Sequence, residues 1–152
     1  MKKYARSLSL LSIALIVLLF SQCKDEGPTI IPIAVGTPYT LQIPSGFPQS
    51  NIQSDNPLTE EGIKLGRFLF YEKALSGDGT QSCGSCHIQE RAFTDVTATS
   101  VGINGDFGTR KAMPLFNLAF HDQFFWDGRS LTLEEQALIP IEDPIEMDNT
   151  LE

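Results

Sequence analysis

Hydrophobic and polar positions follow three patterns along the chain. Almost every position from residue 8 to residue 20 is apolar, whereas residues 24–56 are rich in proline and show no helical period. Such a proline-rich stretch is typical of an extended tether or of a segment laid over the surface of the domain. From residue 57 onward, apolar positions recur at helical spacing in short stretches separated by glycine-rich loops. We therefore expect an extended, Pro-rich N-terminal tether over residues 23–56 and a small all-α domain over residues 57–152.

The first helix of this domain is predicted near residues 59–70. Thr59 is a suitable N-cap, because its side chain can accept a hydrogen bond from the free amides of the first turn, and acidic residues follow it there. Leu65, Phe68 and Leu69 then share one face. The pattern predicts an amphipathic helix.

A second helix is predicted toward the C-terminal end of the domain. Thr132 begins a capping-box pattern, and Pro140 is expected to end the helix after about Ile139. Between the two helices, residues 86–89 and 114–120 favour short helical segments.

The N-terminal apolar run has the features of an export signal. Three basic residues within the first six precede it, and it is too short for a comfortable membrane span. We therefore predict a signal peptide over residues 1–22. The stretch Phe20-Ser21-Gln22-Cys23 resembles a bacterial lipoprotein processing site, which predicts lipidation of Cys23. The protein would then be exported to the periplasm or held as an outer-membrane lipoprotein, touching a membrane only through this lipid anchor.

The charge balance narrows the choice of partners. The chain has 11 basic and 19 acidic residues and a formal net charge of −8. An acidic surface repels nucleic acid and anionic lipid headgroups, so no nucleic-acid partner is expected. The same surface would suit a basic electron-donor protein, and solubility alone explains it equally well.

One short motif indicates the chemistry. Cys83-Gly84-Ser85-Cys86-His87 is a c-type heme attachment sequence, in which two thiols form thioethers to the heme vinyl groups and the adjacent histidine binds the iron. Of the three cysteines, only Cys83 and Cys86 belong to the expected domain, so no disulfide framework is available. Covalent heme c, bound through Cys83, Cys86 and His87, is therefore the predicted cofactor.

Two other kinds of site use cysteines at this spacing. A thioredoxin-type dithiol needs a neighbouring βαβ pattern, which is not evident in this sequence. A structural zinc site needs four ligands, and Cys83, Cys86, His87 and His121 are all the candidates outside Cys23. Because adjacent residues do not easily face one tetrahedral ion, zinc is disfavoured.

Heme attachment alone is compatible with an electron carrier. A small carrier keeps a second strong axial ligand, commonly methionine or histidine. The candidates are Met113, Met147 and His121, and none lies in the setting usual for a small mono-heme cytochrome. A mono-heme electron-transfer or heme-binding module without turnover remains the alternative to an enzyme.

Several further stretches accompany the heme motif in a fixed order. They are residues 65–70, Leu75-Ser76, Phe93-Thr94-Asp95, Arg110, Asn117, residues 125–129, Leu133 with Gln136, and Glu146-Met147. In this set the chain resembles the bacterial di-heme cytochrome c peroxidases and the related methylamine-utilisation (MauG) enzymes, over roughly residues 57–149.

The resemblance implies a cytochrome c-like, peroxide-reacting heme domain. In it His87 would be the proximal iron ligand, Glu146 the distal carboxylate that moves protons during O–O cleavage, and Trp126 the aromatic group between this heme and a second one. Arg129 would bind a heme propionate, with a surface ion pair as the alternative. The implied activity is reduction of hydrogen peroxide to water with electrons from a small cytochrome or cupredoxin. The alternative within the family is MauG-like oxidation of a protein or organic substrate.

The chain departs from the family pattern at three places. Ile103 stands where members that need reductive activation carry a removable distal histidine, so the iron is expected to keep an open position. Lys111 stands where the family often supplies an asparagine to a calcium site, so calcium is not favoured as a second cofactor. No second Cys-x-x-Cys-His occurs within the 152 residues, so the second heme domain would be a missing partner of this chain.

Overall fold

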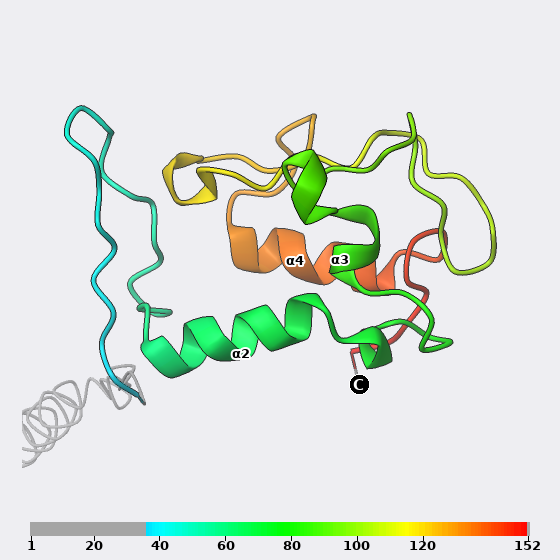
Figure 1. The fold of residues 1–152 in the computed structure, drawn as a ribbon, viewed down its shortest axis with the longest axis horizontal. Helices are drawn as coiled ribbons and strands as arrows, with labels where there is room; N and C mark the ends of the chain where they lie inside the picture. Colours follow the sequence, from blue (N-terminus) through cyan, green and yellow to red (C-terminus); the bar gives the residue numbers. More distant parts are fainter. Residues whose placement is uncertain (1–35, 152) are drawn as a thin grey trace, which may run out of the picture. The chain divides into compact units, whose positions relative to one another are not determined.

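Short helices joined by long loops make up the described part of the molecule (Figure 1). The computed structural model describes residues 36–151; the predicted signal peptide, Cys23 and the tether as far as residue 35 lie outside the described residues. In the described range the elements are helical and the extended pairings are isolated bridges, which confirms the all-α prediction. None of the helices in this range is long and apolar enough to cross a membrane.

Helix α2 spans Glu60–Phe70 and begins as the sequence predicts. The Thr59 hydroxyl accepts a hydrogen bond from the Gly62 amide at 3.0 Å, which satisfies one of the unpaired donors of the first turn. The carboxylates of Glu60 and Glu61 lie at the positive end of the helix dipole. Capping and charge therefore favour this start without help from packing.

The segment before α2 lies against the domain. The Glu61 carboxylate accepts hydrogen bonds from the amide and the hydroxyl of Thr37, at 2.7 and 3.0 Å. Farther along, the Asn51 amide donates to the Ala119 carbonyl at 2.6 Å. Residues 36–56 are therefore an extended strap fastened to the domain at several points (Figure 1).

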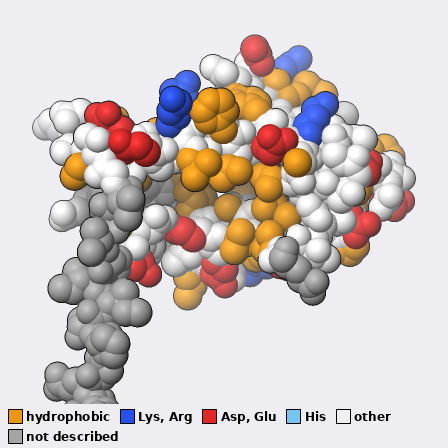
Figure 2. Space-filling model, turned by 90° about the horizontal axis from the view of Figure 1, so that it is seen from below, with side chains coloured by type: hydrophobic (Ala, Val, Ile, Leu, Met, Phe, Trp, Pro, Cys, Tyr) orange, Lys and Arg blue, Asp and Glu red, His pale blue; other side chains and the backbone are white. Residues whose placement is uncertain are grey.

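The apolar face predicted for α2 is left open by the described residues. Leu65, Phe68 and Leu69 are 58%, 66% and 42% exposed. Figure 2, which views the side of the molecule where α2 lies, shows apolar side chains gathered on this surface. The C-terminal end of the helix packs on the domain, where the Phe70 ring lies 6.0 Å from the Phe93 ring.

Helix α4 spans Leu133–Glu142 and passes through Pro140. The prediction that Pro140 ends the helix is wrong. Because Pro140 lies in the last turn, its ring removes one amide donor only, and the Asp143 amide still donates to the Ile139 carbonyl at 3.0 Å. At the other end the Thr132 side chain caps the helix, as the sequence predicts.

The remaining helical elements are single turns. They are α3 at Cys83–Cys86 and 3-10 turns at Lys73–Leu75, Gln89–Arg91 and Leu118–Phe120. The prediction of one helix over residues 86–89 is wrong, because the chain is extended at Ile88 between two separate turns. The helical segment predicted over residues 114–120 is confirmed only in its last three residues.

The hydrophobic core of the described residues is small. Phe124, Ile141 and Met147 are its buried hydrophobic side chains, at 7%, 7% and 5% exposure. They come from the loop before α4, from α4 itself and from the loop after it. The C-terminal segment is thus anchored, whereas Cys83 and Cys86 are only half-buried.

Candidate functional site

The two cysteines of the heme motif lie on one helical turn. The Ser82 amide donates to the Ser85 hydroxyl at 3.0 Å, and the His87 amide donates to the Cys83 carbonyl at 2.9 Å. Hydrogen bonds therefore cap both ends of α3. Both thiols are free. We call residues 82–87 the attachment turn.

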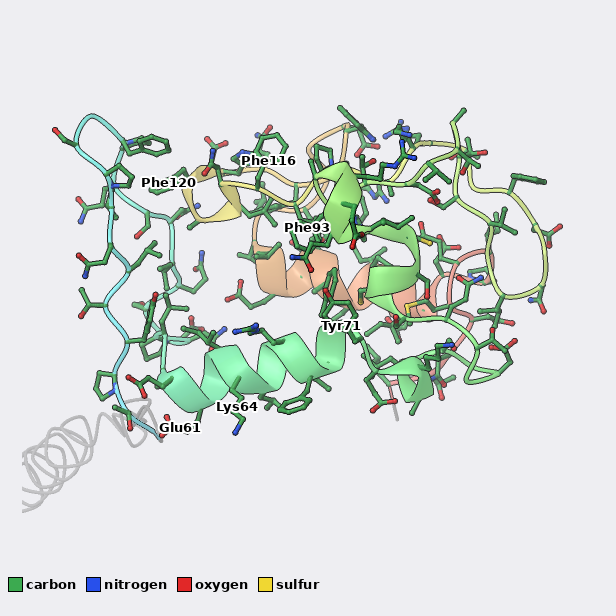
Figure 3. The ribbon with its side chains drawn as sticks, viewed as in Figure 1. Glu61, Lys64, Tyr71, Phe93, Phe116 and Phe120 are labelled. Atoms are coloured by element: carbon green, nitrogen blue, oxygen red, sulfur yellow. The ribbon has the colours of Figure 1, made fainter. Side chains whose placement is uncertain are left out.

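The attachment turn packs closely on the end of α2. A Cβ atom at Gly84 would lie 2.7 Å from the Tyr71 ring, so glycine permits an approach that a larger residue would prevent. Figure 3 shows Tyr71 at the end of α2 and Phe93 near the Gln89–Arg91 turn. The cysteine pair is thereby fixed against an aromatic wall.

A main-chain carbonyl orients the His87 ring. Nδ1 lies 2.8 Å from the Phe93 carbonyl oxygen, and because a carbonyl can only accept, Nδ1 carries the proton. Nε2 is then left with a free lone pair, as iron binding requires. Ala92 and Phe93 both have φ of 57°, and these two left-handed residues turn the carbonyl back toward the imidazole.

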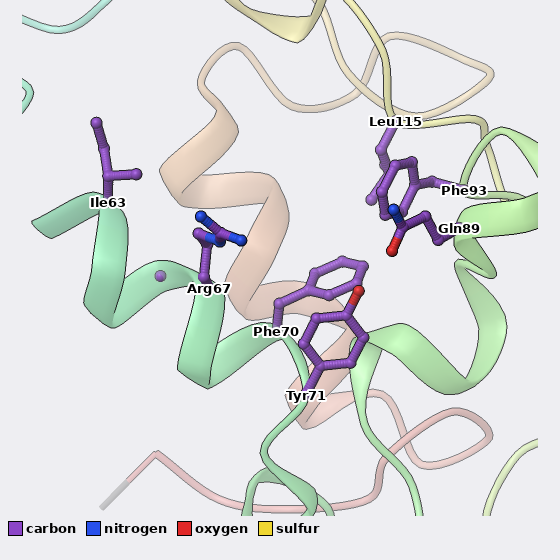
Figure 4. Close-up of a pocket in the computed structure, with 8 residues that line it drawn as sticks. Ile63, Arg67, Phe70, Tyr71, Gln89, Phe93 and Leu115 are labelled. Carbon is purple, nitrogen blue, oxygen red and sulfur yellow. The ribbon is translucent and has the colours of Figure 1, made fainter.

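A cavity of about 400 Å³ lies between α2 and the 89–93 segment (Figure 4). Its lining is largely aromatic and aliphatic. Phe70 and Phe93 form part of the lining, and Phe70 also lies 6.4 Å from the His87 ring between centroids. Arg67 and Gln89 add polar groups to the wall.

Glu146 lies in a turn directly after α4. The Asp143 carboxylate accepts from the Ile145 amide at 2.8 Å, and the Glu146 amide donates to the Asp143 carbonyl at 3.1 Å. The Glu146 carbonyl in turn accepts from the Ile103 amide at 3.1 Å. The glycine-rich loop that contains Ile103 therefore holds this turn from the other side. We call residues 143–148 the carboxylate loop.

Two glycines let the carboxylate loop approach the rest of the domain. A Cβ atom at Gly102 would overlap the Ile145 carbonyl oxygen, and one at Gly77 would overlap the Asp148 carbonyl oxygen. The Gly77 amide also donates to the Met147 carbonyl at 2.8 Å. The loop is thus seated by backbone contacts on two separate segments.

The electrostatic surroundings of Glu146 favour its protonated form. Glu146 as a whole residue is exposed, but the protein atoms around its carboxyl desolvate that group in part, and this desolvation raises the pKa of Glu146. The negative charge of Asp143 raises the pKa further, and the positive charge of Arg129 opposes the rise. The result is a carboxyl group that can take up or release a proton closer to neutral pH.

The charge of Glu146 also reaches the attachment turn. Burial raises the pKa of the Cys83 and Cys86 thiols, and the negative charge of Glu146 acts in the same direction on both. An electrostatic effect on both thiols requires the carboxyl to lie near them. The charge of Glu146 thus acts on both cysteines of the turn, and His87 follows Cys86 directly in the chain.

Trp126 and Arg129 occupy the loop between Phe124 and Ser130. The Trp126 indole is 60% exposed and donates from Nε1 to the Lys111 carbonyl at 2.8 Å. Arg129 stacks on the Phe125 ring, with the guanidinium carbon 3.4 Å from the ring centroid.

The same arginine takes part in an ion-pair cluster. Asp127 binds Arg129 at 3.0 Å and Arg110 at 2.9 Å. Desolvation works against ionisation of Asp127, but the hydrogen bonds and charges of both arginines outweigh it and hold the pKa of Asp127 below its ordinary range. The ion pair that the sequence offered as an alternative role for Arg129 is therefore present.

The sequence also offered Met113, Met147 and His121 as iron ligands, and Met113 is a half-buried loop residue. Met147 is buried in the core, and the His121 ring stacks beside Phe124 with 6.4 Å between centroids. Within residues 36–151, no three His, Cys, Asp or Glu side chains gather into a group that could hold a metal ion.

Three contributors to the site were missed by sequence reasoning. The left-handed pair at Ala92 and Phe93 has no sequence signal, because neither residue is glycine or asparagine. Asp143 gave a weak signal as a turn former before Pro144. The bonds made by the side chain and the carbonyl of Lys111 join segments that are distant in sequence.

The donor set fits covalent heme c. Two free, half-buried thiols lie on one helical turn, and the adjacent imidazole presents Nε2 with its ring already fixed. The described residues also bury few hydrophobic side chains of their own, so a large planar cofactor would complete the core.

Comparisons with known proteins agree with this chemistry. A family model described as "Di-haem cytochrome c peroxidase" matches residues 60–152. A methylamine utilization protein MauG of Methylorubrum extorquens is 39% identical over 97 residues, covering 64% of this chain and 28% of the relative. Cytochrome c peroxidase Ccp of Escherichia coli is 38% identical over 100 residues, covering 66% of this chain and 22% of the relative.

A solved structure is similar over the same region. The crystal structure of a MauG-like protein associated with microbial copper homeostasis has a TM-score of 0.67 and 44% identity, covering 72% of this chain and 35% of that protein. The chain thus spans about a third or less of the length of these relatives. Because the family model matches more than half of the chain, from residue 60 onward, the protein belongs to the di-haem cytochrome c peroxidase family.

Proposed function

We propose that this chain is the peroxide-reacting heme domain of an exported di-heme peroxidase, which reduces hydrogen peroxide to water. The observation that carries the proposal is the position of Glu146. Its carboxyl has a raised pKa, and its charge reaches both thiols of the attachment turn. An acid–base group beside a heme-binding turn is what a peroxidase needs and an electron carrier does not.

The attachment turn would hold the cofactor. Cys83 and Cys86 would form the thioethers of heme c, and Nε2 of His87 would bind the iron while Nδ1 stays hydrogen-bonded to the Phe93 carbonyl. When bound, the heme supplies an iron that takes peroxide as a ligand and delivers electrons to it. The imidazole, already fixed by its bond to the Phe93 carbonyl, would offer Nε2 as a single protein ligand to the iron.

Glu146 would move the proton. One carboxylate oxygen accepts a proton from the first peroxide oxygen and returns it to the second, which leaves as water. Overall, one peroxide, two electrons and two protons give two waters. A raised pKa suits this exchange, because a group that must both take and give a proton works best when its pKa is near the operating pH.

Trp126 and Arg129 would serve the partners of this heme. The exposed Trp126 indole would lie between this heme and that of a second domain, which would receive electrons from a small cytochrome or cupredoxin. Arg129 would bind a heme propionate, and even in its ion pair with Asp127 its charge helps to keep Glu146 ionised. Export to the periplasm, with a lipid anchor on Cys23, belongs to the same proposal, and mass spectrometry of the mature N-terminus tests it.

Two alternatives remain to be separated by experiment. A mono-heme module without turnover would carry electrons and leave peroxide unchanged. A MauG-like enzyme would use the same site to oxidise a protein or organic substrate. The similarity of this chain to MauG proteins supports this second candidate function.

The deciding experiment is peroxide reduction by the heme-loaded chain. The protein is matured with covalent heme, reduced chemically so that no second domain is needed, and mixed with hydrogen peroxide. We expect peroxide consumption coupled to heme oxidation, over repeated cycles with excess reductant. A heme that can be reduced but does not consume peroxide would support the electron-transfer module instead. A colourless product after correct maturation would contradict heme binding itself.

A further inference from the structure

The Lys111 side chain donates hydrogen bonds to two main-chain carbonyl oxygens. Its ammonium group donates to the Asp95 carbonyl at 2.8 Å and to the Thr97 carbonyl at 2.7 Å. Two of its three N–H donors are therefore used on one short loop. These carbonyls belong to the segment that follows Phe93, whose own carbonyl orients His87.

Main-chain carbonyl pairs of this kind are also typical ligands of calcium. Calcium does not fit at these two oxygens, because the ammonium of Lys111 already occupies the space between them. A positive charge is supplied there by a side chain that is covalently part of the protein. Unlike an ion, it cannot be removed by a chelator.

The backbone of the same residue holds Trp126. The Lys111 carbonyl accepts the Trp126 indole N–H at 2.8 Å, although the indole is 60% exposed. The next residue is held as well, since the Thr94 hydroxyl donates to the Ala112 carbonyl. Residues 111–112 therefore stand between the loop after the proximal histidine and Trp126, and are bonded to both.

We propose that Lys111 is a positioning residue, whose ammonium acts as a tethered cation that fixes Trp126 relative to the 94–97 loop without calcium. The side chain pins the Lys111 backbone to the Asp95 and Thr97 carbonyls, and the pinned backbone presents its carbonyl to the indole. This proposal concerns how firmly the Trp126 indole is held, and it does not depend on whether the domain reduces peroxide.

The test uses the single tryptophan of the chain, whose indole N–H gives one resonance in a ¹⁵N-labelled sample. The sample is the heme-loaded protein in its diamagnetic, ferrous CO-bound form. In the wild type we expect the position of this resonance and its exchange rate with solvent to be the same in excess EDTA and in added calcium.

Variants then separate the cation from the general fold. Lys111→Met keeps the aliphatic stem and removes the ammonium, and should speed indole exchange about tenfold, because charge-assisted hydrogen bonds are lost. Lys111→Arg should restore the wild-type rate. Lys64→Met is the matched control, since Lys64 projects from α2 into solvent (Figure 3) and should leave the resonance unchanged.

Two results would overturn the proposal. One is a wild-type resonance that moves when EDTA or calcium is added. The other is a Lys111→Met protein that behaves like Lys64→Met. If Lys111→Met fails to fold, Lys111→Gln replaces it, and the wild-type chelation experiment still decides the calcium part.

Discussion

The attachment turn and the carboxylate loop face the same site, yet they are built differently. In the attachment turn the backbone hydrogen bonds join near neighbours in sequence, and the His87 ring bonds to the Phe93 carbonyl six positions away. The carboxylate loop is seated instead on Gly77 and on Gly102-Ile103, which are far away in sequence. Apart from the packing of Gly84 on Tyr71, mostly local contacts shape the turn that would hold the cofactor, whereas contacts with distant segments position the carboxyl that would carry the proton. Heme attachment and peroxide chemistry should therefore be separable by mutation.

Among the substitutions that test this difference, the largest effect on stability is expected at Gly102. A Cβ atom there would overlap the Ile145 carbonyl, so Gly102→Ala should push the carboxylate loop off its seat and destabilise the fold by about 3 kcal/mol. Heme attachment should survive, because the attachment turn does not depend on Gly102. Urea unfolding and heme staining of denatured protein measure the two effects.

Gly66 offers the matched control. A Cβ atom at this position meets nothing within 4 Å, and the residue lies inside α2. Gly66→Ala should therefore stabilise the protein by about 0.8 kcal/mol through helix propensity alone. Equal changes in stability for the two substitutions would contradict a close backbone contact between Gly102 and the carboxylate loop.

The second prediction concerns the pH dependence of the peroxide reaction. Proton uptake by Glu146 should slow the reaction on the acid side, with a midpoint above the ordinary glutamate value of 4.5. Asp143→Asn removes a negative charge and should lower the midpoint, while Arg129→Gln removes a positive charge and should raise it. Arg91→Gln, an exposed charge change outside the site, should leave it in place.

The same shift has a consequence for stability. A raised pKa means that the folded protein holds this proton more tightly than the unfolded chain does. The stabilising contribution of Glu146 is therefore present at low pH and is lost as the pH rises through the raised pKa. Glu146→Gln should flatten this part of the stability profile, and an unchanged slope would argue against the raised pKa.

The smallest expected effect lies beside the attachment turn. Ala92 has a left-handed backbone, so Ala92→Gly should relieve strain and stabilise the protein by about 0.5 kcal/mol after the entropy of the more flexible unfolded chain is subtracted. Ala112→Gly, at a residue without positive φ, should destabilise it. Thermal unfolding measures the change in stability of both variants. If both changes had the same sign, the backbone at Ala92 would not be strained.

Sequence alone predicted the parts of the molecule that depend on local chemistry. The Thr59 and Thr132 caps and the all-α class are confirmed because each follows from neighbouring residues. The heme motif could be read in the same way, because its thiols and imidazole are adjacent. The family resemblance supplied Glu146, which by itself would have been one acid among several.

Sequence could not predict what depends on distant contacts. Nothing local shows that Leu65 and Phe68 stay exposed, since exposure depends on what packs against α2. Pro140 was expected to end α4, but in the last turn it removes only one donor. The ammonium of Lys111 meets its carbonyls only once the loop around residues 95–97 has folded onto it.

The most direct test of the account is the first reaction of the heme-loaded protein with hydrogen peroxide, followed by rapid mixing. Wild type is compared with Glu146→Gln and with Glu142→Gln, a matched change at an exposed neighbour. We predict that Glu146→Gln keeps its covalent heme and slows this reaction by about 100-fold or more, while Glu142→Gln reacts at the wild-type rate. A Glu146→Gln protein that reacts as fast as Glu142→Gln would contradict the claim that this carboxyl carries the proton.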